Sequence, residues 1–324
     1  MQTILRIFRS VSFPVVSRTA IPKSRLHFRT TSACFLSRSH SFTPKRRHDC
    51  ILPDCVWPSN LPPATEWGYG KIGPDTWPSK YPDAGGKKQS PVDIVTSSVL
   101  PKEFDQPLRW KYGSENSTSI VNTGCGWRVD VHGSDSELCG GPLLHTYELV
   151  QFHCHWGSSY SCGSEHTIDG KSYAGELHFV HWNKETFPTC ADAIPSAEGL
   201  SVVAVFLQEG EMNSEIEKLC EVIPSILEKD QRVNLENDIN PESLFPSEHS
   251  YWTYSGSLTT PPCYESVTWI IFKNPITVSA EQLNCFRQMK NARCDVNSES
   301  SGLVEHNYRP PQSLNDRVIF ESVC

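Results

Sequence analysis

The chain has 324 residues, of which 38% are hydrophobic and 20% are charged. This length and composition can bury a large core, which excludes fibrous, low-complexity and fully disordered classes. Residues 1–48 carry ten basic side chains and no acidic one, whereas residues 49–324 carry 19 basic against 37 acidic side chains, a formal charge near −18. Because such an acidic body repels nucleic acid and anionic membranes, we expect neither as its partner.

The first 48 residues differ from the rest in composition, being rich in Arg, Ser and Thr and free of acid. Mitochondrial and chloroplast transit peptides have this composition. The best apolar run for a secretory signal, residues 11–16, is short and interrupted by Pro14. A basic arm that binds nucleic acid remains the alternative for this segment. We predict a transit peptide over residues 1–48 and one domain over residues 49–324, without a membrane span, because no apolar run approaches the roughly 18 residues that one needs.

Thirteen cysteines are scattered over the chain, and none forms a Cys-x-x-Cys pair. In a chain of this size such spacing does not indicate a disulfide framework. We therefore expect most of them to be free thiols buried as small hydrophobic groups.

Strands are the predicted elements over most of the body, after an irregular segment at residues 50–88 that is rich in Pro, Gly and Trp. Between Gln89 and Val278, short alternating or apolar runs are separated by Gly, Pro, Asn and Ser, a pattern typical of β-rich domains. We predict strands at Ser119–Val121, Trp127–Val131, Tyr147–Trp156, Glu176–Trp182, Leu200–Leu207 and Ser266–Phe272.

Two amphipathic helices are predicted within this β-rich body. Ser214 and Glu217 fit a capping box before apolar residues at helical spacing, and Pro224 ends the pattern. The second helix begins after Ser279, which is paired with Gln282, and buries Leu283, Phe286 and Met289. The sequence thus predicts a mainly β (α+β) fold with short peripheral helices.

Two histidines, His153 and His155, lie two residues apart in the predicted strand Tyr147–Trp156. Side chains alternate along a strand, so both imidazoles face one side and Cys154 faces the other. Two imidazoles therefore converge from one strand, and Cys154 is expected in the core.

A third imidazole comes from the predicted strand Glu176–Trp182, in which Glu176 and His178 share a face and His181 points away. If the two strands pair, His178 meets the first two histidines. Three neutral imidazoles suit Zn²⁺ and leave a fourth position for water, as in catalytic zinc sites. Such a metal makes hydroxide available near neutral pH.

The simpler alternative is that these histidines are hydrogen-bonded core residues or unrelated surface residues. A metal-bound histidine needs an acceptor that fixes its tautomer, and Glu176 lies on the same face as His178. The presence of this carboxylate favours the zinc site.

The chain resembles the α-class carbonic anhydrases from about Trp67 to Phe320. The motifs that carry the resemblance, besides the two histidine strands, are Trp67-Gly68-Tyr69-Gly70, Gln89-Ser90-Pro91-Val92-Asp93-Ile94, Gly140-Gly141-Pro142, Gly163-Ser164-Glu165-His166-Thr167, Tyr251-Trp252-Thr253-Tyr254 and Gly256-Ser257-Leu258-Thr259-Thr260-Pro261-Pro262. The resemblance implies a large, twisted, mostly antiparallel sheet with a conical cleft that ends at zinc, and reversible hydration of carbon dioxide to bicarbonate and a proton by zinc-bound hydroxide.

The resemblance also implies roles for individual residues. His153, His155 and His178 would bind zinc, and Gln151, Glu176 and the backbone of Asn307 would support these ligands. Thr259 would accept a hydrogen bond from the hydroxide and donate one to Glu165. The pocket for carbon dioxide would be lined by Val180, Val202, Leu258, Val267, Trp269 and Thr260, although plain core positions would look the same in the sequence.

Two positions depart from the family's pattern. Cys125 stands where efficient members carry a histidine that relays the proton, so proton release should depend on external buffer or on another group at the cleft mouth. His132 and His145 are candidates for this task, although ordinary exposed loop histidines would look the same in the sequence. Secreted members often join a cysteine before the Gln89 motif to one after the Pro-Pro pair by a disulfide. Here the second position is Cys263 but the first is Ala84, so this disulfide cannot form. Mitochondrial members also lack that relay histidine, and together with residues 1–48 this predicts location in the mitochondrial matrix.

Two other functions remain open from the sequence. A carbonic-anhydrase-like domain that binds without catalysis typically lacks one or more zinc ligands, whereas this chain keeps all three. A zinc hydrolase acting on esters would use the same hydroxide.

Overall fold

The computed structural model describes residues 57–58, 67–291 and 302–323. The predicted transit peptide, residues 1–48, lies outside this part of the chain. Fifteen strands occur in the described residues, and thirteen of them form one mixed sheet. The strands are β1 (Asp93–Ile94), β2 (Leu100–Lys102), β3 (Arg109–Lys111), β4 (Ser117–Asn122), β5 (Trp127–Val131), β6 (Glu137–Cys139), β7 (Tyr147–Trp156), β8 (Thr167–Ile168), β9 (Gly175–Asn183), β10 (Leu200–Glu209), β11 (Arg232–Asn234), β12 (Tyr251–Gly256), β13 (Val267–Phe272), β14 (Ile276–Val278) and β15 (Phe320–Ser322).

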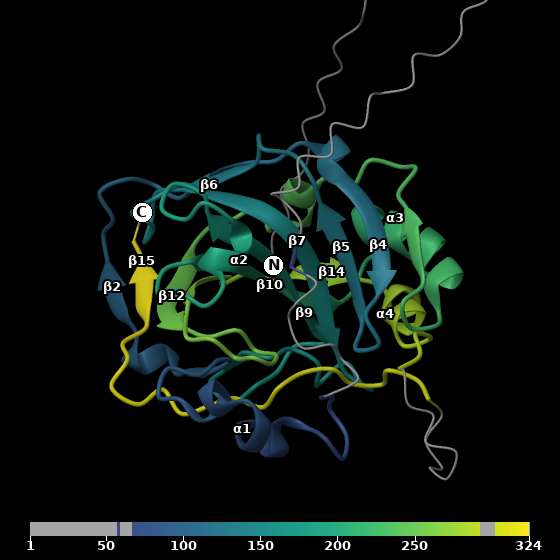
Figure 1. Cartoon of the computed structure of the whole chain (residues 1–324), viewed down its shortest axis with the longest axis horizontal. Helices are drawn as coiled ribbons and strands as arrows, with labels where there is room; N and C mark the ends of the chain where they lie inside the picture. The colour runs from purple at the N-terminus through teal and green to yellow at the C-terminus, as the bar shows by residue number, and fades with distance from the viewer. Residues whose placement is uncertain (1–56, 59–66, 292–301, 324) are drawn as a thin grey trace, which may run out of the picture. The chain divides into compact units, whose positions relative to one another are not determined.

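The large sheet follows the order β11-β4-β5-β7-β9-β10-β13-β12-β15-β2, with β3, β6 and β14 paired off this path. Its central run from β11 to β10 is antiparallel throughout. Parallel pairs join β10 to β13 and β14, and β15 to β2, so the sheet is mixed but mostly antiparallel. The strands do not close into a barrel within the described residues, and Figure 1 shows β7 and β9 in the middle of the sheet.

Alternation along the central strands sends successive side chains to two different cores. On β9, Leu177 and Phe179 join one buried cluster, whereas Val180 and Trp182 join the other. Every residue of β9 is buried as a result. The alternation of its side chains between the two cores remains readable in the sequence, and the predicted bounds of β9 differ from the observed ones by one residue at each end.

In the described part of the chain, four α-helices lie at the periphery: α1 (Trp77–Lys80), α2 (Cys190–Ala193), α3 (Ser214–Val222) and α4 (Ala280–Phe286). Helices α3 and α4 bury Leu219 and Phe286 in the same core as Trp156 of β7, and they lie beside β4 in Figure 1. The rings of Phe286 and Trp156 are 5.6 Å apart, and burying such a side chain contributes about 1.5–3 kcal/mol. These two helices therefore cover one face of β5 and β7 and leave the histidine face open.

The predicted cap of α4 is confirmed and that of α3 is wrong. Ser279 and Gln282 form a capping box at the start of α4. At α3 the cap is Asn213, whose side chain accepts hydrogen bonds from the backbone N–H of Glu215 and Ile216. Asn213 already satisfies these free N–H groups one residue earlier, so Ser214 becomes the first helical residue.

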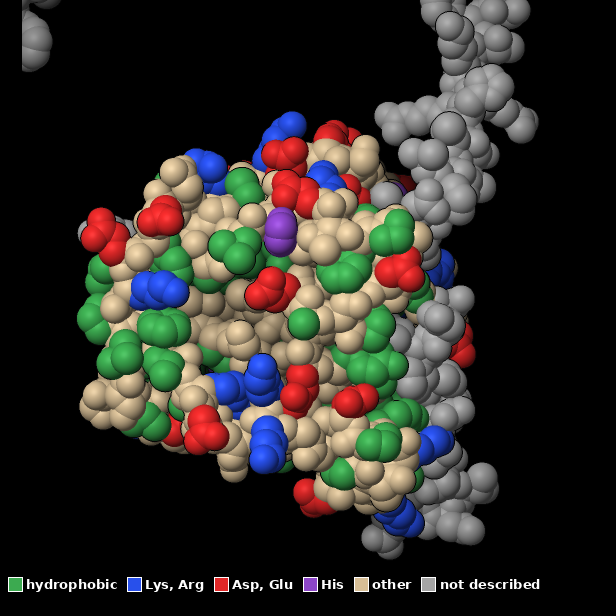
Figure 2. Space-filling model, turned by 60° about the vertical axis from the view of Figure 1, so that its left-hand side comes forward, with side chains coloured by type: hydrophobic (Ala, Val, Ile, Leu, Met, Phe, Trp, Pro, Cys, Tyr) green, Lys and Arg blue, Asp and Glu red, His purple; other side chains and the backbone are tan. Residues whose placement is uncertain are grey.

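The segment before β1 is irregular, as predicted, and consists of short helical turns over an aromatic cluster. Trp67 and Trp77 are buried there beside Ala84 and Cys263. The eight cysteines that the structure describes are all free thiols. Within the same described residues no helix is long and apolar enough to cross a membrane. Acidic and basic side chains are mixed over the face drawn in Figure 2.

Candidate metal centre

The three histidines meet on one face of the paired strands β7 and β9. His153 stands directly opposite His178 in the ladder, and His155 stands opposite Glu176. Side chains of directly opposed residues lie on the same face of a sheet. The metal-binding nitrogens of His153, His155 and His178 consequently lie within 4.8 Å of one another.

The second nitrogen of each imidazole points to an oxygen acceptor. His153 Nδ1 is 2.8 Å from Gln151 Oε1, and His155 Nδ1 is 2.7 Å from the carbonyl oxygen of Asn307. On β9, His178 Nε2 is 2.7 Å from Glu176 Oε1. Because these oxygens only accept, the three nitrogens donate, and the lone pairs remain on His153 Nε2, His155 Nε2 and His178 Nδ1.

This donor set fits Zn²⁺ in number, chemistry and spacing. Nitrogens at about 2.0–2.1 Å from a tetrahedral zinc lie roughly 3.3 Å apart. His153 Nε2 and His155 Nε2 are 3.1 Å apart although both carry lone pairs. Two facing lone pairs repel, so a cation between them makes the arrangement stable.

Burial keeps the three imidazoles neutral. It lowers the pKa of His155 to about 3, with a further contribution from the nearby His178. The pKa values of His153 and His178 are also lowered, in both cases chiefly by burial. Neutral imidazole is the form that binds metal, so no proton has to be displaced near neutral pH.

Glu176 connects the metal site to the core beneath it. Its Oε2 accepts hydrogen bonds from the backbone N–H of Glu165 and His166, and its Oε1 contacts both His166 and His178. Burial alone would raise the pKa of Glu176, but His166 and His178 lower it below its usual range. The carboxylate is therefore ionised and fixes the ring of His178. His166 in turn contacts the hydroxyl of Tyr254 at 2.7 Å.

Glu165 and Thr259 form a second polar pair beside the histidines. The Thr259 side chain hydrogen-bonds to Glu165, and the backbone N–H of Arg309 donates to Glu165 Oε1 at 2.8 Å. Glu165 Oε2 is buried without a hydrogen-bond partner among the described residues and lies 3.4 Å from His155 Nε2. Burial raises the pKa of Glu165 well above its usual range, and the hydrogen bond from Thr259 acts in the opposite direction.

A cavity of about 780 Å³ opens onto His153 and His155. Gln151, Asn307, Leu258, Thr260 and Cys125 also lie on its wall. Four of the residues expected to line a carbon dioxide pocket, Val180, Val202, Val267 and Trp269, are instead found together in the core cluster behind this wall. Three of them are adjacent across the sheet, since Val202 pairs with both Val180 and Trp269. The Trp269 ring lies 4.8 Å from that of His178.

Cys125 sits in a tight turn at the side of the cavity, between Gly124 at φ +84° and Gly126 at φ +146°. A Cβ on Gly126 would lie 2.7 Å from Asn307 Nδ2, so this backbone is held close to the residue that supports His155. Burial raises the pKa of the Cys125 thiol to about 12, although Lys229 opposes the shift. The thiol is therefore a poor proton carrier at neutral pH.

The other histidines divide clearly by position. His132 lies on the cavity wall, whereas His145 lies outside it, is half-buried and contacts Glu185. His181 is fully buried on the opposite face and contacts the hydroxyl of Tyr112 at 2.9 Å, as expected of a structural histidine. Cys154 is buried in the core with Phe152, also as predicted.

Sequence reasoning missed two contributors to the site. Arg309 is 1% exposed, and its side chain donates to Gln89, Ser90 and the carbonyl of Ala84. Because its backbone N–H also donates to Glu165, Arg309 connects the irregular first segment to the site. Arg128 stands opposite His153 in the ladder. Arg309 has no local sequence signal, but the alternation of Arg128 and Asp130 on a predicted strand next to the histidine strand could have revealed the second.

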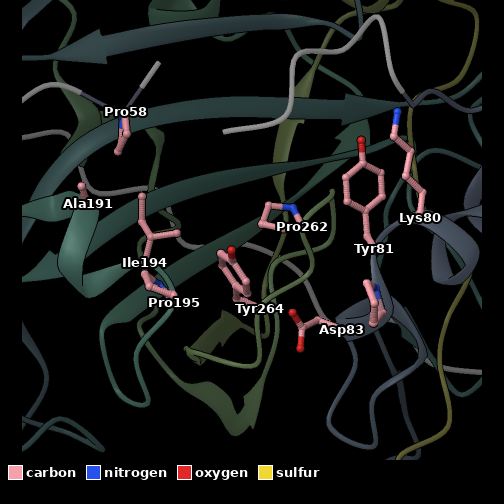
Figure 3. A pocket seen from close by; sticks show the side chains of 10 residues that line it. Pro58, Lys80, Tyr81, Asp83, Ala191, Ile194, Pro195, Pro262 and Tyr264 are labelled. Atoms are coloured by element: carbon pink, nitrogen blue, oxygen red, sulfur yellow. The ribbon is translucent and has the colours of Figure 1, made fainter. Parts of the chain in front are cut away.

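A smaller cavity of about 400 Å³ lies on the other side of the turn that carries Thr259. Thr260 and Pro261 face the large cavity, while Pro262 and Tyr264 line the small one. Figure 3 shows Pro262 and Tyr264 between Ile194 and Tyr81 in that view. No histidine lines this cavity, so the metal chemistry belongs to the large one.

Two comparisons with known proteins agree with this geometry. The family model for eukaryotic-type carbonic anhydrase matches residues 72–323. Carbonic anhydrase 1 of Mus musculus is 42% identical over 262 residues, which cover 80% of this chain and 99% of that protein. With a histidine triad that fits zinc beside its large cavity, the chain belongs to the eukaryotic-type carbonic anhydrase family.

Proposed function

We propose that this carbonic anhydrase carries out the reversible hydration of carbon dioxide with zinc held by His153, His155 and His178. One observation carries the assignment. Each of the three imidazoles donates a hydrogen bond to an oxygen through one ring nitrogen, and the lone pairs on the other ring nitrogens converge. When bound, zinc supplies the activation of water at neutral pH, for which carbonic anhydrase is the standard example. All other tasks fall to the side chains around it.

Gln151, Glu176 and the Asn307 carbonyl hold the three rings in the tautomers that face the metal. Such supporting partners typically account for a factor of roughly 10–100 in metal affinity. Thr259, bonded to Glu165, accepts a hydrogen bond from the attacking water species and sets its direction. The neutral substrate is received at the cavity wall, where Leu258 and Thr260 lie, and the apolar cluster of Val180, Val202, Val267 and Trp269 backs this wall.

A pair of substitutions at Thr259 tests this arrangement. Thr259→Val keeps the shape but removes the hydroxyl, and it should lower kcat/KM for hydration by about 100-fold, as loss of an orienting polar group does in other enzymes. Thr259→Ser retains the hydroxyl and should stay within about tenfold of the wild type. Zinc content should be unchanged in both. Equal activity of Thr259→Val and the wild type would overturn the role of this hydroxyl.

We also propose that the enzyme works in the mitochondrial matrix after removal of most of residues 1–48. The acid-free, Arg-rich composition of this head supports the proposal, as does the free thiol of Cys263 beside Ala84. Expression with a C-terminal tag, followed by fractionation and N-terminal sequencing, tests it. The matched control replaces the ten basic residues of the head with Gln and should remain in the cytosol. Secretion of the wild type, or Cys263 blocked by a disulfide, would contradict the proposal.

A further inference from the structure

A row of aligned residues runs across the sheet from the metal site to its edge. Arg128 on β5 is opposite His153, Val121 on β4 is opposite Arg128, and Arg232 on β11 is opposite Val121. Opposed residues share a face, and neighbouring strands are about 4.8 Å apart. Arg128 is therefore the immediate neighbour of His153, with Arg232 two strands further out on the same cavity wall.

One carboxylate holds both guanidinium groups in place. Arg128 Nε donates to Asp130 Oδ1 at 2.7 Å, and Arg232 Nη1 donates to Asp130 Oδ2 and to Ser119 Oγ. The Asp130 side chain is only 7% exposed, so its partners are fixed rather than free to rotate into solvent. In the part of the chain that the structure describes, the terminal Nη groups of Arg128 and the Nη2 of Arg232 make no hydrogen bond, and these donors remain available at the cavity wall.

The charge of this cluster is opposite to that of the body around it. Two arginines against one aspartate leave one positive charge, whereas residues 49–324 carry about −18. Lys229 and Asp230, which line the same cavity, offset each other. An anion that approaches the protein is therefore attracted here and repelled over the body as a whole.

We propose that Arg128 and Arg232 form an oxyanion site, separate from the metal, that binds small carboxylate-type anions, with bicarbonate among them. The planar fork of a guanidinium group matches the two oxygens of such an anion. Carbon dioxide is neutral and gains nothing from these charges, so the site serves the charged side of the reaction. Its use for bicarbonate rests on the proposed function, whereas the binding of carboxylates does not.

The test is an anion titration of the zinc-loaded protein, followed through the guanidinium Nε–H resonances of ¹⁵N-labelled arginine. The probes are sodium acetate, which is not a substrate, and sodium bicarbonate, each against sodium chloride at constant ionic strength. Both probes should shift the Arg128 and Arg232 signals in a saturable manner. Arg128→Gln and Arg232→Gln should each weaken acetate binding about tenfold, as loss of a charge-assisted pair predicts.

Arg109→Gln is the matched control, because Arg109 is exposed on β3 and, among the described residues, its side chain hydrogen-bonds to Gln106 alone; it should leave binding unchanged. A two-dimensional spectrum of each variant establishes that it is folded, and Arg232→Gln at the sheet edge provides a second test if Arg128→Gln is not. Shifts that merely follow ionic strength, or acetate binding that survives both substitutions, would overturn the site. Either failure would leave carbon dioxide hydration intact and so would be distinct from failure of the proposed function.

Discussion

His153 and His178 are directly opposed residues of β7 and β9. This pairing brings an imidazole from a second strand to the two that β7 supplies, and the metal site depends on it. A shift of one residue in the register would send His178 to the far face of the sheet. The apolar alternation of β9, with Leu177 and Phe179 in one core and Val180 in the other, excludes that shift.

His178→Ala should abolish zinc binding and hydration together. Loss of a supporting partner alone costs roughly 10–100-fold in metal affinity, so loss of the ligand should cost more than about 100-fold. Zinc content by atomic spectroscopy and stopped-flow hydration measure the two effects. His249→Ala, at an exposed position that packs against Trp110 outside the cavity, is the control and should resemble the wild type. Full zinc content in His178→Ala would contradict the ligand assignment.

Glu176→Gln should weaken zinc binding by about 10–100-fold while the three ligands remain. The amide cannot supply the negative charge that fixes the ring of His178, and it replaces one acceptor oxygen with a donor. Competition with a zinc-binding dye measures the affinity, and Glu185→Gln at the surface is the control. Unchanged affinity would show that the contact between Glu176 and His178 does not support the metal.

Cys125→His should raise the maximal hydration rate at low buffer concentration and leave kcat/KM nearly unchanged. An imidazole titrates near neutral pH, whereas burial raises the pKa of the Cys125 thiol to about 12. Proton release follows the attack on carbon dioxide, so only the maximal rate should respond. Stopped-flow assays over a range of buffer concentrations measure both parameters. Cys139→His on β6 is the control, and equal changes in kcat and kcat/KM would show that position 125 has no part in proton release.

The unfolding free energy of the metal-depleted protein should fall as the pH drops below about 6.5, in part because of His181. Burial lowers the pKa of His181 to about 3 in the folded state, while the unfolded chain takes up the proton near 6.5. Stability from this residue is therefore present above pH 6.5 and is lost towards pH 3, by at most about 1.4 kcal/mol per pH unit. Urea unfolding at several pH values should give a shallower slope for His181→Gln. An identical slope would mean that His181 does not titrate in this range.

The central strands and the histidine triad could be predicted from sequence because each depends on local alternation. Strands β5 and β7 have the predicted bounds, and the same period of two places His153 and His155 together. The short edge strands, such as β2 with all three residues exposed, carry no such pattern. Strand β2 forms only because β15 arrives beside it from the other end of the chain.

The residues that support the metal ligands also differ in whether a local sequence pattern reveals them. Glu176 is near His178 in sequence and could be recognised, whereas the carbonyl of Asn307 reaches His155 across 152 positions. Arg309 acts on Glu165 through a backbone N–H, which no side-chain pattern reveals. Long-range contacts of this kind are fixed by the tertiary fold, so they were accessible only through the family resemblance or the structure.

The most direct test of the whole account is carbon dioxide hydration measured by stopped flow on one preparation in three states: as purified, depleted of zinc by a chelator, and reloaded with zinc. Zinc content is determined in each state. Activity should follow zinc up to one ion per chain and return on reloading. Hydration that persists in the zinc-depleted protein, or zinc that binds fully without restoring it, would contradict zinc catalysis at the histidine triad.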